Sequence, residues 1–336
     1  MARRVILDVD PGIDDALAVL LALRSPEIEV VAVTTVAGNV TVDLGTKNAL
    51  SILASAGAAN TPVYPGAARP LVGRLTTATF FHGKDGLGGV ELSEPTTPAQ
   101  SMPAAAFLVE ASRGPEPVTI VATGPLTNLA LACRLDPVFA SRVERIVVMG
   151  GAVACPGNVT PVAEANVYTD PEAAAIVLDS GAPITLVGLD LTMKAGLTPT
   201  RFEEAVGRAR LDDSIGKIAI RLMQAYLDVA AKVGSDSAAL HDPLAVAVAC
   251  LPDLVSTRRL QIAVELAGTL TRGQTVAWLS GTEEMRMLRG DHIDIVGIQP
   301  VVGKVDVAMA VDAERFFDLF LRRLLSGPSS SALASS

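Results

Sequence analysis

Short runs of apolar, often β-branched residues alternate along the chain with longer stretches rich in alanine and leucine. The short runs predict strands at Val5–Asp8, Val30–Thr35, Thr119–Ala122, Ile146–Met149 and Thr185–Gly188. The longer stretches predict helices at Asp14–Arg24, Leu44–Ala56, Pro103–Ser112, Leu126–Cys133 and Pro171–Ser180. Because the strands are almost continuously apolar, helices are expected on both faces of the sheet. The alternation predicts an α/β fold with an open, mostly parallel central sheet flanked by helices.

The second part of the chain is more helical, from Pro199 to Leu251. Later apolar runs predict strands at Leu260–Leu266, Thr275–Leu279, Ile293–Val296 and Val305–Val311, followed by a helix at Ala313–Leu325. No repeat and no shift in composition marks a linker, so the pattern predicts a single domain over residues 1–326. The Ser/Ala-rich segment 327–336 is predicted to be disordered.

The composition argues against several classes of protein: nucleic-acid-binding, membrane-spanning, and disulfide- or zinc-stabilised proteins. The net charge of −9 argues against a nucleic-acid partner, because phosphate binding needs clustered lysine and arginine. The longest apolar runs fall short of the roughly 20 residues of a membrane-spanning helix. The first residues run directly into an apolar strand without a signal-peptide pattern, so we expect a cytoplasmic protein. The cysteines at positions 133, 155 and 250 match neither a disulfide framework nor a zinc spacing.

Polar side chains recur just past the predicted strand ends, where ligands bind in parallel α/β sheets. The densest group follows the first strand: Asp8, Asp10, Asp14 and Asp15. A solvated acidic patch fits poorly between an apolar strand and an apolar helix, and a bound cation would relieve the repulsion. Carboxylate oxygens suit a hard ion, calcium or magnesium. Asp14 has the alternative role of a helix cap.

A second candidate lies far downstream, at His241-Asp242-Pro243, before an apolar helix. Asp242 suits the helix N-cap and Pro243 the first helical position. His241 is either an acid/base group or a structural histidine, and its position leaves both roles open.

The Asp8-Val9-Asp10 sequence also resembles the strand end of haloacid-dehalogenase-type phosphatases. In that alternative Asp8 is the nucleophile and Asp10 the acid/base group, with magnesium between them. That family usually continues with a small residue and threonine or valine, whereas Pro11-Gly12 follows here.

Seven segments together resemble the inosine–uridine-preferring nucleoside N-ribohydrolases. They are DVDPGIDDA from Asp8, TTVAGN from Thr34, HGKDGLGG from His82, ATGPLTNLA from Ala122, VVMGG from Val147, GNVTPVAEANVYTDPEAA from Gly157 and HDPLAVA from His241. The resemblance covers roughly residues 4 to 325 and implies an open α/β fold with a mainly parallel sheet, of the Rossmann-like type.

This resemblance implies hydrolysis of ribonucleosides to ribose and free base. It implies that Ca²⁺ is held by Asp10, Asp15, Asp242 and the main-chain carbonyl of Thr123. It implies a substrate pocket formed by Asp14, Asn39, His82, Met149, Asn158, Glu164, Asn166 and Asp242. Asp10 is the implied general base toward a calcium-bound water, and His241 assists departure of the base.

The part of the pocket that faces the base departs from some relatives. Ala165, Ala225 and Val229 stand where some of them carry aromatic residues. The preferred base therefore stays open, as does a non-catalytic nucleoside-binding role. The resemblance implies a homodimer or homotetramer and a small ribonucleoside as the only other partner.

Overall fold

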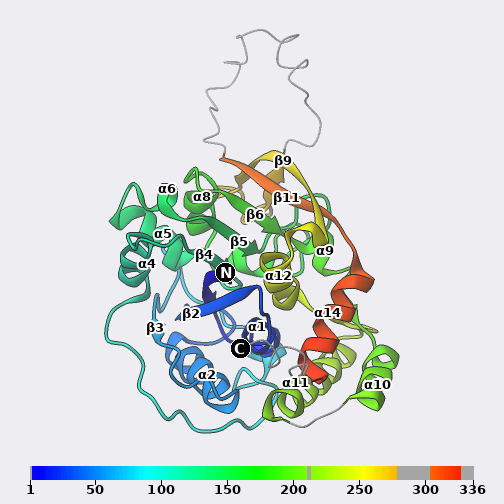
Figure 1. Cartoon of the computed structure of the whole chain (residues 1–336). Helices are drawn as coiled ribbons and strands as arrows, with labels where there is room; N and C mark the ends of the chain where they lie inside the picture. Colours follow the sequence, from blue (N-terminus) through cyan, green and yellow to red (C-terminus); the bar gives the residue numbers. More distant parts are fainter. Residues whose placement is uncertain (1, 210–212, 278–302, 327–336) are drawn as a thin grey trace.

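In the part of the chain that the structure describes, a nine-stranded sheet forms the centre of the molecule (Figure 1). The computed structural model describes residues 2–209, 213–277 and 303–326. The strands lie in the order β10-β9-β11-β6-β5-β4-β1-β2-β3. Their bounds are β1 (Arg3–Val9), β2 (Ile28–Thr35), β3 (Val63–Pro65), β4 (Thr119–Ala122), β5 (Arg145–Met149), β6 (Ile184–Val187), β9 (Val255–Val264), β10 (Thr275–Ala277) and β11 (Gly303–Val311). A separate pair joins β7 (Gly196–Leu197) to β8 (Ala238–Ala239).

Seven neighbouring strands, from β3 to β11, are parallel, and β9 and β10 add an antiparallel edge. The chain winds outward from β1 to β3, then returns to β4 on the other side of β1 and continues to β6. The direction of winding therefore reverses between β1 and β4. Ligands of such sheets bind beyond the carboxyl ends of the strands at this reversal.

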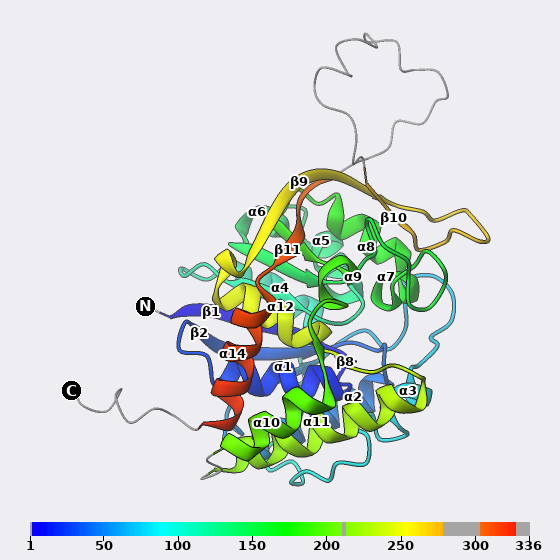
Figure 2. The ribbon, with the colours of Figure 1, turned by 90° about the vertical axis from the view of Figure 1, so that its right-hand side faces the viewer.

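Helices cover both faces of the sheet, as the two perpendicular views show (Figures 1 and 2). The helices of one face are α1 (Ile13–Leu23), α2 (Val42–Ser55), α10 (Pro199–Arg208), α11 (Ser214–Lys232), α12 (His241–Cys250) and α14 (Ala313–Leu325). The other face carries α4 (Ala104–Ser112), α5 (Thr127–Leu135), α6 (Phe139–Arg142) and α8 (Pro171–Leu178). The short helices are α3 (Thr79–His82), α7 (Ala165–Thr169) and α9 (Leu189–Thr192), of which α9 directly follows β6, and a 3₁₀ turn spans Pro252–Leu254.

Alternate residues of each central strand enter separate cores. In β1, Leu7 packs with α1 and α12, whereas Ile6 packs with α4 and α5. Because successive side chains of a strand point to opposite faces, two buried faces require an unbroken apolar run. This requirement explains why the predicted strands showed no polar alternation.

The predicted α/β class and the mostly parallel sheet are confirmed. All ten elements predicted up to residue 188 are present, with ends that differ by at most two residues. The predicted strand at Leu260–Leu266 is wrong at its start, because β9 begins five residues earlier, at Val255. The predicted strand Ile293–Val296 and the segment 327–336 lie outside the described residues. Among the described helices, none combines the length and apolar character needed to cross a membrane.

Asn128, at the start of α5, ties together three strand ends. Its side-chain amide donates to Asp8 Oδ1 at 2.8 Å and to the carbonyl of Thr35 at 2.9 Å, and its carbonyl oxygen accepts from the N–H of Ala67. Thr34 donates to the same Asp8 oxygen at 2.6 Å. This network connects the carboxyl ends of β1 and β2, and the residues just after β3, to α5.

We predict that Asn128→Ala destabilises the fold. The substitution removes all three hydrogen bonds in the interior, and a buried polar group left without a partner costs about 1–3 kcal/mol. Urea unfolding followed by circular dichroism should show a loss of at least that size. The control, Asn60→Ala, changes an exposed turn residue and should leave the unfolding free energy within about 0.5 kcal/mol. Equal stability of the two variants would show that the network adds nothing.

Candidate active site

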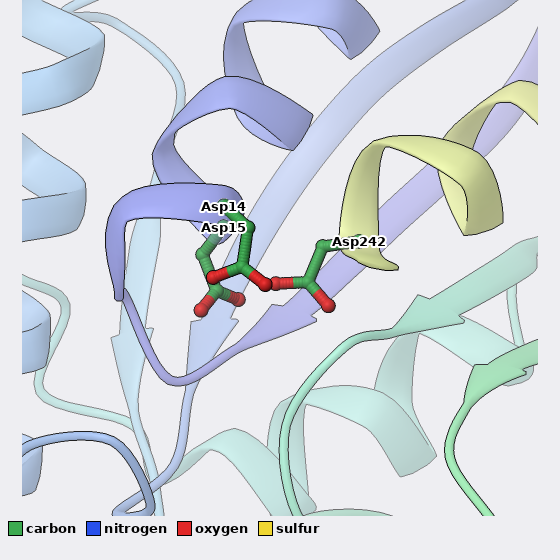
Figure 3. Close-up of side chains that lie close together, drawn as sticks. All are labelled: Asp14, Asp15 and Asp242. Atoms are coloured by element: carbon green, nitrogen blue, oxygen red, sulfur yellow. The ribbon is translucent and has the colours of Figure 1, made fainter. Parts of the chain in front are cut away.

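Three buried carboxylates meet where two helices begin. Asp14 and Asp15 lie in the first turn of α1, directly after the end of β1. Asp242 lies in the first turn of α12 and points toward them from across the site (Figure 3). One carboxylate oxygen of each residue lies within 4.8 Å of the others. Segments more than 200 residues apart in the sequence therefore form one anionic cluster.

Burial away from solvent makes it costly in free energy to ionise the three carboxylates of this cluster and the neighbouring Asp10. Asp10, Asp14, Asp15 and Asp242 are only 1, 6, 0 and 3 % exposed. Burial raises the pKa of Asp14 to about 6 and holds the pKa of Asp10 well above its ordinary value, with the charge of Asp15 adding to the effect. Burial and then the charges of Asp14 and Asp15 do the same to the pKa of Asp242. A positive ion would stabilise all four ionised carboxylates.

Three aspartate oxygens in this region have no hydrogen-bond donor among the described residues. They are Asp8 Oδ2, Asp10 Oδ1 and Asp14 Oδ1, all fully buried. A buried acceptor without a partner is costly unless something else binds it. Free carboxylate oxygens are the ligands that hard divalent cations prefer. The residues therefore fit a divalent cation.

Asp10 lies beside the cluster, and the loop after β2 holds it. Its Oδ2 accepts from the N–H of Asn39 at 2.7 Å, while the Asn39 side chain donates to Asp15 Oδ2 at 3.2 Å. The backbone of Gly38 lies so close to Asp10 that a Cβ there would collide with the carboxylate. The compact three-carboxylate group contains Asp14 and does not include Asp10. The role of Asp10 as a metal ligand stays a prediction.

Thr123 follows β4 and contacts the site through two groups. Its hydroxyl donates to Asp15 Oδ1 at 2.7 Å. Its carbonyl accepts from the side-chain amide of Asn166 at 2.6 Å, and the same amide lies 3.2 Å from the carbonyl of Met149. The predicted metal carbonyl and two predicted substrate residues thus lie side by side at the ends of β4 and β5.

Glu164 is a buried carboxylate at the start of α7. It accepts from the N–H groups of Gly151, Asn166 and Val167 at 2.9–3.1 Å. Burial raises its pKa, and these hydrogen bonds lower it. Asn158 is exposed, and its Oδ1 accepts from the N–H of Ala165 at 3.0 Å. Asn158 therefore lies at the rim of this part of the site.

Two histidines border the acidic cluster. His82 Nδ1 accepts from the N–H of Ile13 at 3.2 Å and lies 4.0 Å from Asp14 Oδ1. His241 begins α12, and its Nδ1 lies 2.8 Å from Thr192 Oγ1. Burial lowers the pKa of each ring to about 4, and for His241 the neighbouring His82 adds to this effect. Both rings are therefore neutral near pH 7.

The structure adds two contacts that sequence reasoning missed. The hydroxyl of Tyr226 lies 3.3 Å from Asp14 Oδ2 and 2.8 Å from the carbonyl of Ala239. Thr192 contacts His241. Tyr226 lies in the middle of an amphipathic helix and Thr192 in a short helix after a strand, so neither carries a local signal of its contact.

The geometry does not favour the phosphatase alternative. A nucleophilic Asp8 would have to reach a phosphate ester. Its side chain is 0 % exposed, and Oδ1 is held by Thr34 and Asn128. Asp8 therefore belongs to the interior network of the sheet.

The comparisons with known proteins agree with this geometry. The family model described as "Inosine-uridine preferring nucleoside hydrolase" matches residues 5–318. A curated relative, "Pyrimidine-specific ribonucleoside hydrolase RihA" of Salmonella arizonae, is 39 % identical over 329 residues, covering 96 % of this chain and 99 % of that protein.

Two solved structures are similar over almost the whole chain. The "Plant nucleoside hydrolase - PpNRh1 enzyme" is 36 % identical with a TM-score of 0.85, covering 98 % of this chain and 100 % of that one. The "Purine-Preferring Ribonucleoside Hydrolase from Gardnerella vaginalis" is 33 % identical with a TM-score of 0.82, covering 96 % and 98 %.

We predict that Ca²⁺ or Mg²⁺ binds here and raises the melting temperature. A free concentration of 100 times the dissociation constant adds about 2.7 kcal/mol of stability. Because the raised pKa of Asp14 keeps its carboxyl group protonated below about pH 6, binding must displace a proton at low pH. Affinity should therefore fall from about pH 7.5 to about pH 5.5 in isothermal titration calorimetry.

Two aspartate variants test this prediction. Asp15→Asn should remove most of the thermal shift caused by the cation. Asp136→Asn changes a buried aspartate that pairs with Arg113 and Arg142, and it should keep the shift. A thermal shift that survives Asp15→Asn unchanged would place the cation elsewhere.

Proposed function

The chain belongs to the inosine-uridine preferring nucleoside hydrolase family, and we propose that it hydrolyses the N-glycosidic bond of ribonucleosides with a calcium-activated water. The products are ribose and the free base. The observation that carries the proposal is the convergence of Asp14, Asp15 and Asp242 at the reversal between β1 and β4, with His241 beside them. Membership of this family makes the chain an enzyme that acts on N-glycosyl compounds.

Four groups are proposed to hold the cation: the carboxylates of Asp10, Asp15 and Asp242, and the main-chain carbonyl of Thr123. When bound, such an ion lowers the pKa of a coordinated water and orients it. An all-oxygen set of carboxylates and a carbonyl suits calcium, which accepts irregular geometry more readily than magnesium. The free oxygen of Asp10 and the cluster of Asp15 with Asp242 support this assignment.

The ribose is proposed to lie against the acidic side of the site. Its hydroxyls are expected to contact Asp14, Asn39, Asn158, Glu164, Asn166 and Asp242, with His82 and the main chain of Met149 lining the same pocket. Cleavage of a glycosidic bond develops positive charge on the sugar ring. Carboxylates fixed in a buried site stabilise that charge without having to reorganise.

The reaction needs a base for water and a hydrogen-bond donor for the leaving group. As the water oxygen bonds to C1′, the Asp10 carboxylate takes one of the water protons. The electron pair of the breaking C1′–N bond leaves with the base, and His241 supplies a hydrogen bond or proton to it. The contact between His241 Nδ1 and Thr192 Oγ1 supports this assignment, because it holds one ring nitrogen and leaves the other available.

Base preference is a separate question, since the names of similar proteins differ: a relative that is 39 % identical is named pyrimidine-specific, and one that is 33 % identical is named purine-preferring. Incubation with inosine, uridine and p-nitrophenyl riboside, followed by a reducing-sugar assay, tests the proposal. Release of ribose from a nucleoside supports it. Binding of nucleosides without release would identify a non-catalytic nucleoside-binding protein.

We predict a strong preference for ribose over 2′-deoxyribose. Asp14, Asn166 and Asp242 are expected to bind the ribose hydroxyls, and a site built to bond a hydroxyl can reject the analogue without it by about 10⁴–10⁵. The measurement is kcat/KM for uridine against deoxyuridine. Similar values for both would mean that these side chains do not bind the 2′-hydroxyl.

We predict that Asp10→Asn and His241→Ala fail in different ways. Asp10 acts on the attacking water, so its loss should lower kcat on every substrate alike. His241 acts on the leaving group, so His241→Ala should lower kcat on inosine by about 10²–10⁴. The p-nitrophenolate leaving group needs no proton, so the same variant should keep most activity on p-nitrophenyl riboside. Equal losses on both substrates would rule out a role in departure of the base.

A further inference from the structure

The helix α9 is held rigidly against the end of β5. Its first residue, Leu189, donates its N–H to the carbonyl of Gly151 at 2.9 Å. The carboxylate of Asp190 accepts from the N–H groups of Val153 and Ala154 at 2.9 and 2.8 Å. These three bonds attach a helix of four residues to the loop that follows a central strand, so its last residue, Thr192, has a fixed place.

The segment before His241 is tied to the segment after α9. The N–H of Leu240 donates to the carbonyl of Ala195 at 3.0 Å. Next to this bond, β7 pairs antiparallel with β8, with Gly196 opposite Ala239. Residues 192 and 241 are 49 positions apart in the chain, and this pairing sets their relative position.

Thr192 is fully buried, and its Oγ1 lies 2.8 Å from His241 Nδ1. Within the part of the chain that the structure describes, this hydroxyl has no other hydrogen-bond partner. His241 Nε2 has none either, and the histidine is partly exposed. One ring nitrogen is therefore anchored to the interior, and the other is available to a ligand.

We infer that Thr192 is a positioning residue that orients His241 toward the leaving base. The hydroxyl of Thr192 donates to Nδ1, which keeps the ring proton of the imidazole on Nε2. Nε2 then presents an N–H donor to the base nitrogen that receives the electron pair of the broken bond. This inference rests on the proposed hydrolysis of nucleosides, because it assigns Thr192 a part in that reaction.

The tautomer matters because a neutral imidazole has one N–H and one lone pair. Without a donor at Nδ1, the ring can carry its proton on Nδ1 and present a lone pair to the departing base. That arrangement repels the base nitrogen as negative charge builds on it. The interaction with His241 grows as the bond breaks, so the loss should appear in kcat rather than in KM.

Two substitutions at position 192 separate the hydroxyl from the shape of the side chain. Thr192→Val keeps the shape and removes the donor, whereas Thr192→Ser keeps the donor. Thr46→Val is the matched control, since Thr46 Oγ1 makes a buried hydrogen bond of the same 2.8 Å length to Thr35 on another part of the sheet. Each variant is assayed with inosine, uridine and p-nitrophenyl riboside.

Thr192→Val should lower kcat on the nucleosides by about 10- to 100-fold, the size of loss seen when a hydrogen bond that orients a metal-bound histidine is removed. Its kcat on p-nitrophenyl riboside should stay within about twofold of the wild type. Thr192→Ser and Thr46→Val should resemble the wild type on all substrates. Equal losses on both kinds of substrate, or no loss, would overturn the inference while leaving the proposed function intact.

Nitrogen-15 NMR of the histidine rings supplies a readout that does not depend on activity. With His241→Ala as the assignment control, His241 should show the Nε2–H tautomer in the wild type and a mixture in Thr192→Val. An unchanged tautomer in Thr192→Val would overturn the inference. If the wild type releases no ribose from any substrate, the proposed function fails, and the NMR result alone decides whether Thr192 holds the ring.

Discussion

Buried negative charge is the constraint on which the site depends. Asp10, Asp14, Asp15 and Asp242 lie almost out of contact with solvent, and the donors that contact the first three are neutral hydroxyls, amides and backbone N–H groups. Hydrogen bonds from neutral donors reduce the cost of burying carboxylates but do not cancel their mutual repulsion. A divalent cation would lower the cost of burying the carboxylates and would also offset their mutual repulsion. In the proposed reaction, the carboxylates that would hold the cation would also face the positively charged sugar ring.

The sheet makes this arrangement possible because its winding reverses between β1 and β4. At that reversal the connections diverge, and the space between them is open to side chains from several strand ends. Asp10 and Asp15 follow β1, Asn39 follows β2 and Thr123 follows β4. Close approach of the backbone at Gly38 lets the loop after β2 cover the carboxylate of Asp10. The surrounding network of Asp8 and Asn128 holds these strand ends in place.

The site has an acidic side and a side that carries the histidines. Tyr226 connects them, since its hydroxyl lies between Asp14 and the carbonyl of Ala239, two residues before His241. Its ring packs edge-on against Phe81, the neighbour of His82. Tyr226 therefore links the histidine side of the site to Asp14. Ala225 and Val229, which the resemblance to the family assigns to the base side, lie on the same helix as Tyr226.

The sequence by itself determined the fold class, the position of most strands and helices, and the short motifs that carry the acids. It could do so because apolar periodicity and a dense local group of aspartates are properties of neighbouring residues. The nine-stranded order and the contacts of Thr192 and Tyr226 were decided only by the tertiary structure. The meeting of Asp14 and Asp15 with Asp242 was implied beforehand only by the resemblance to a family, and the tertiary structure brings the three carboxylates together. Each of these pairings and contacts joins segments that are far apart in the chain. The local pattern of apolar and polar residues in one segment does not indicate which other segment it will contact. The physical reason is that strand pairing and the burial of shared surfaces, rather than local preference, set the distances between them.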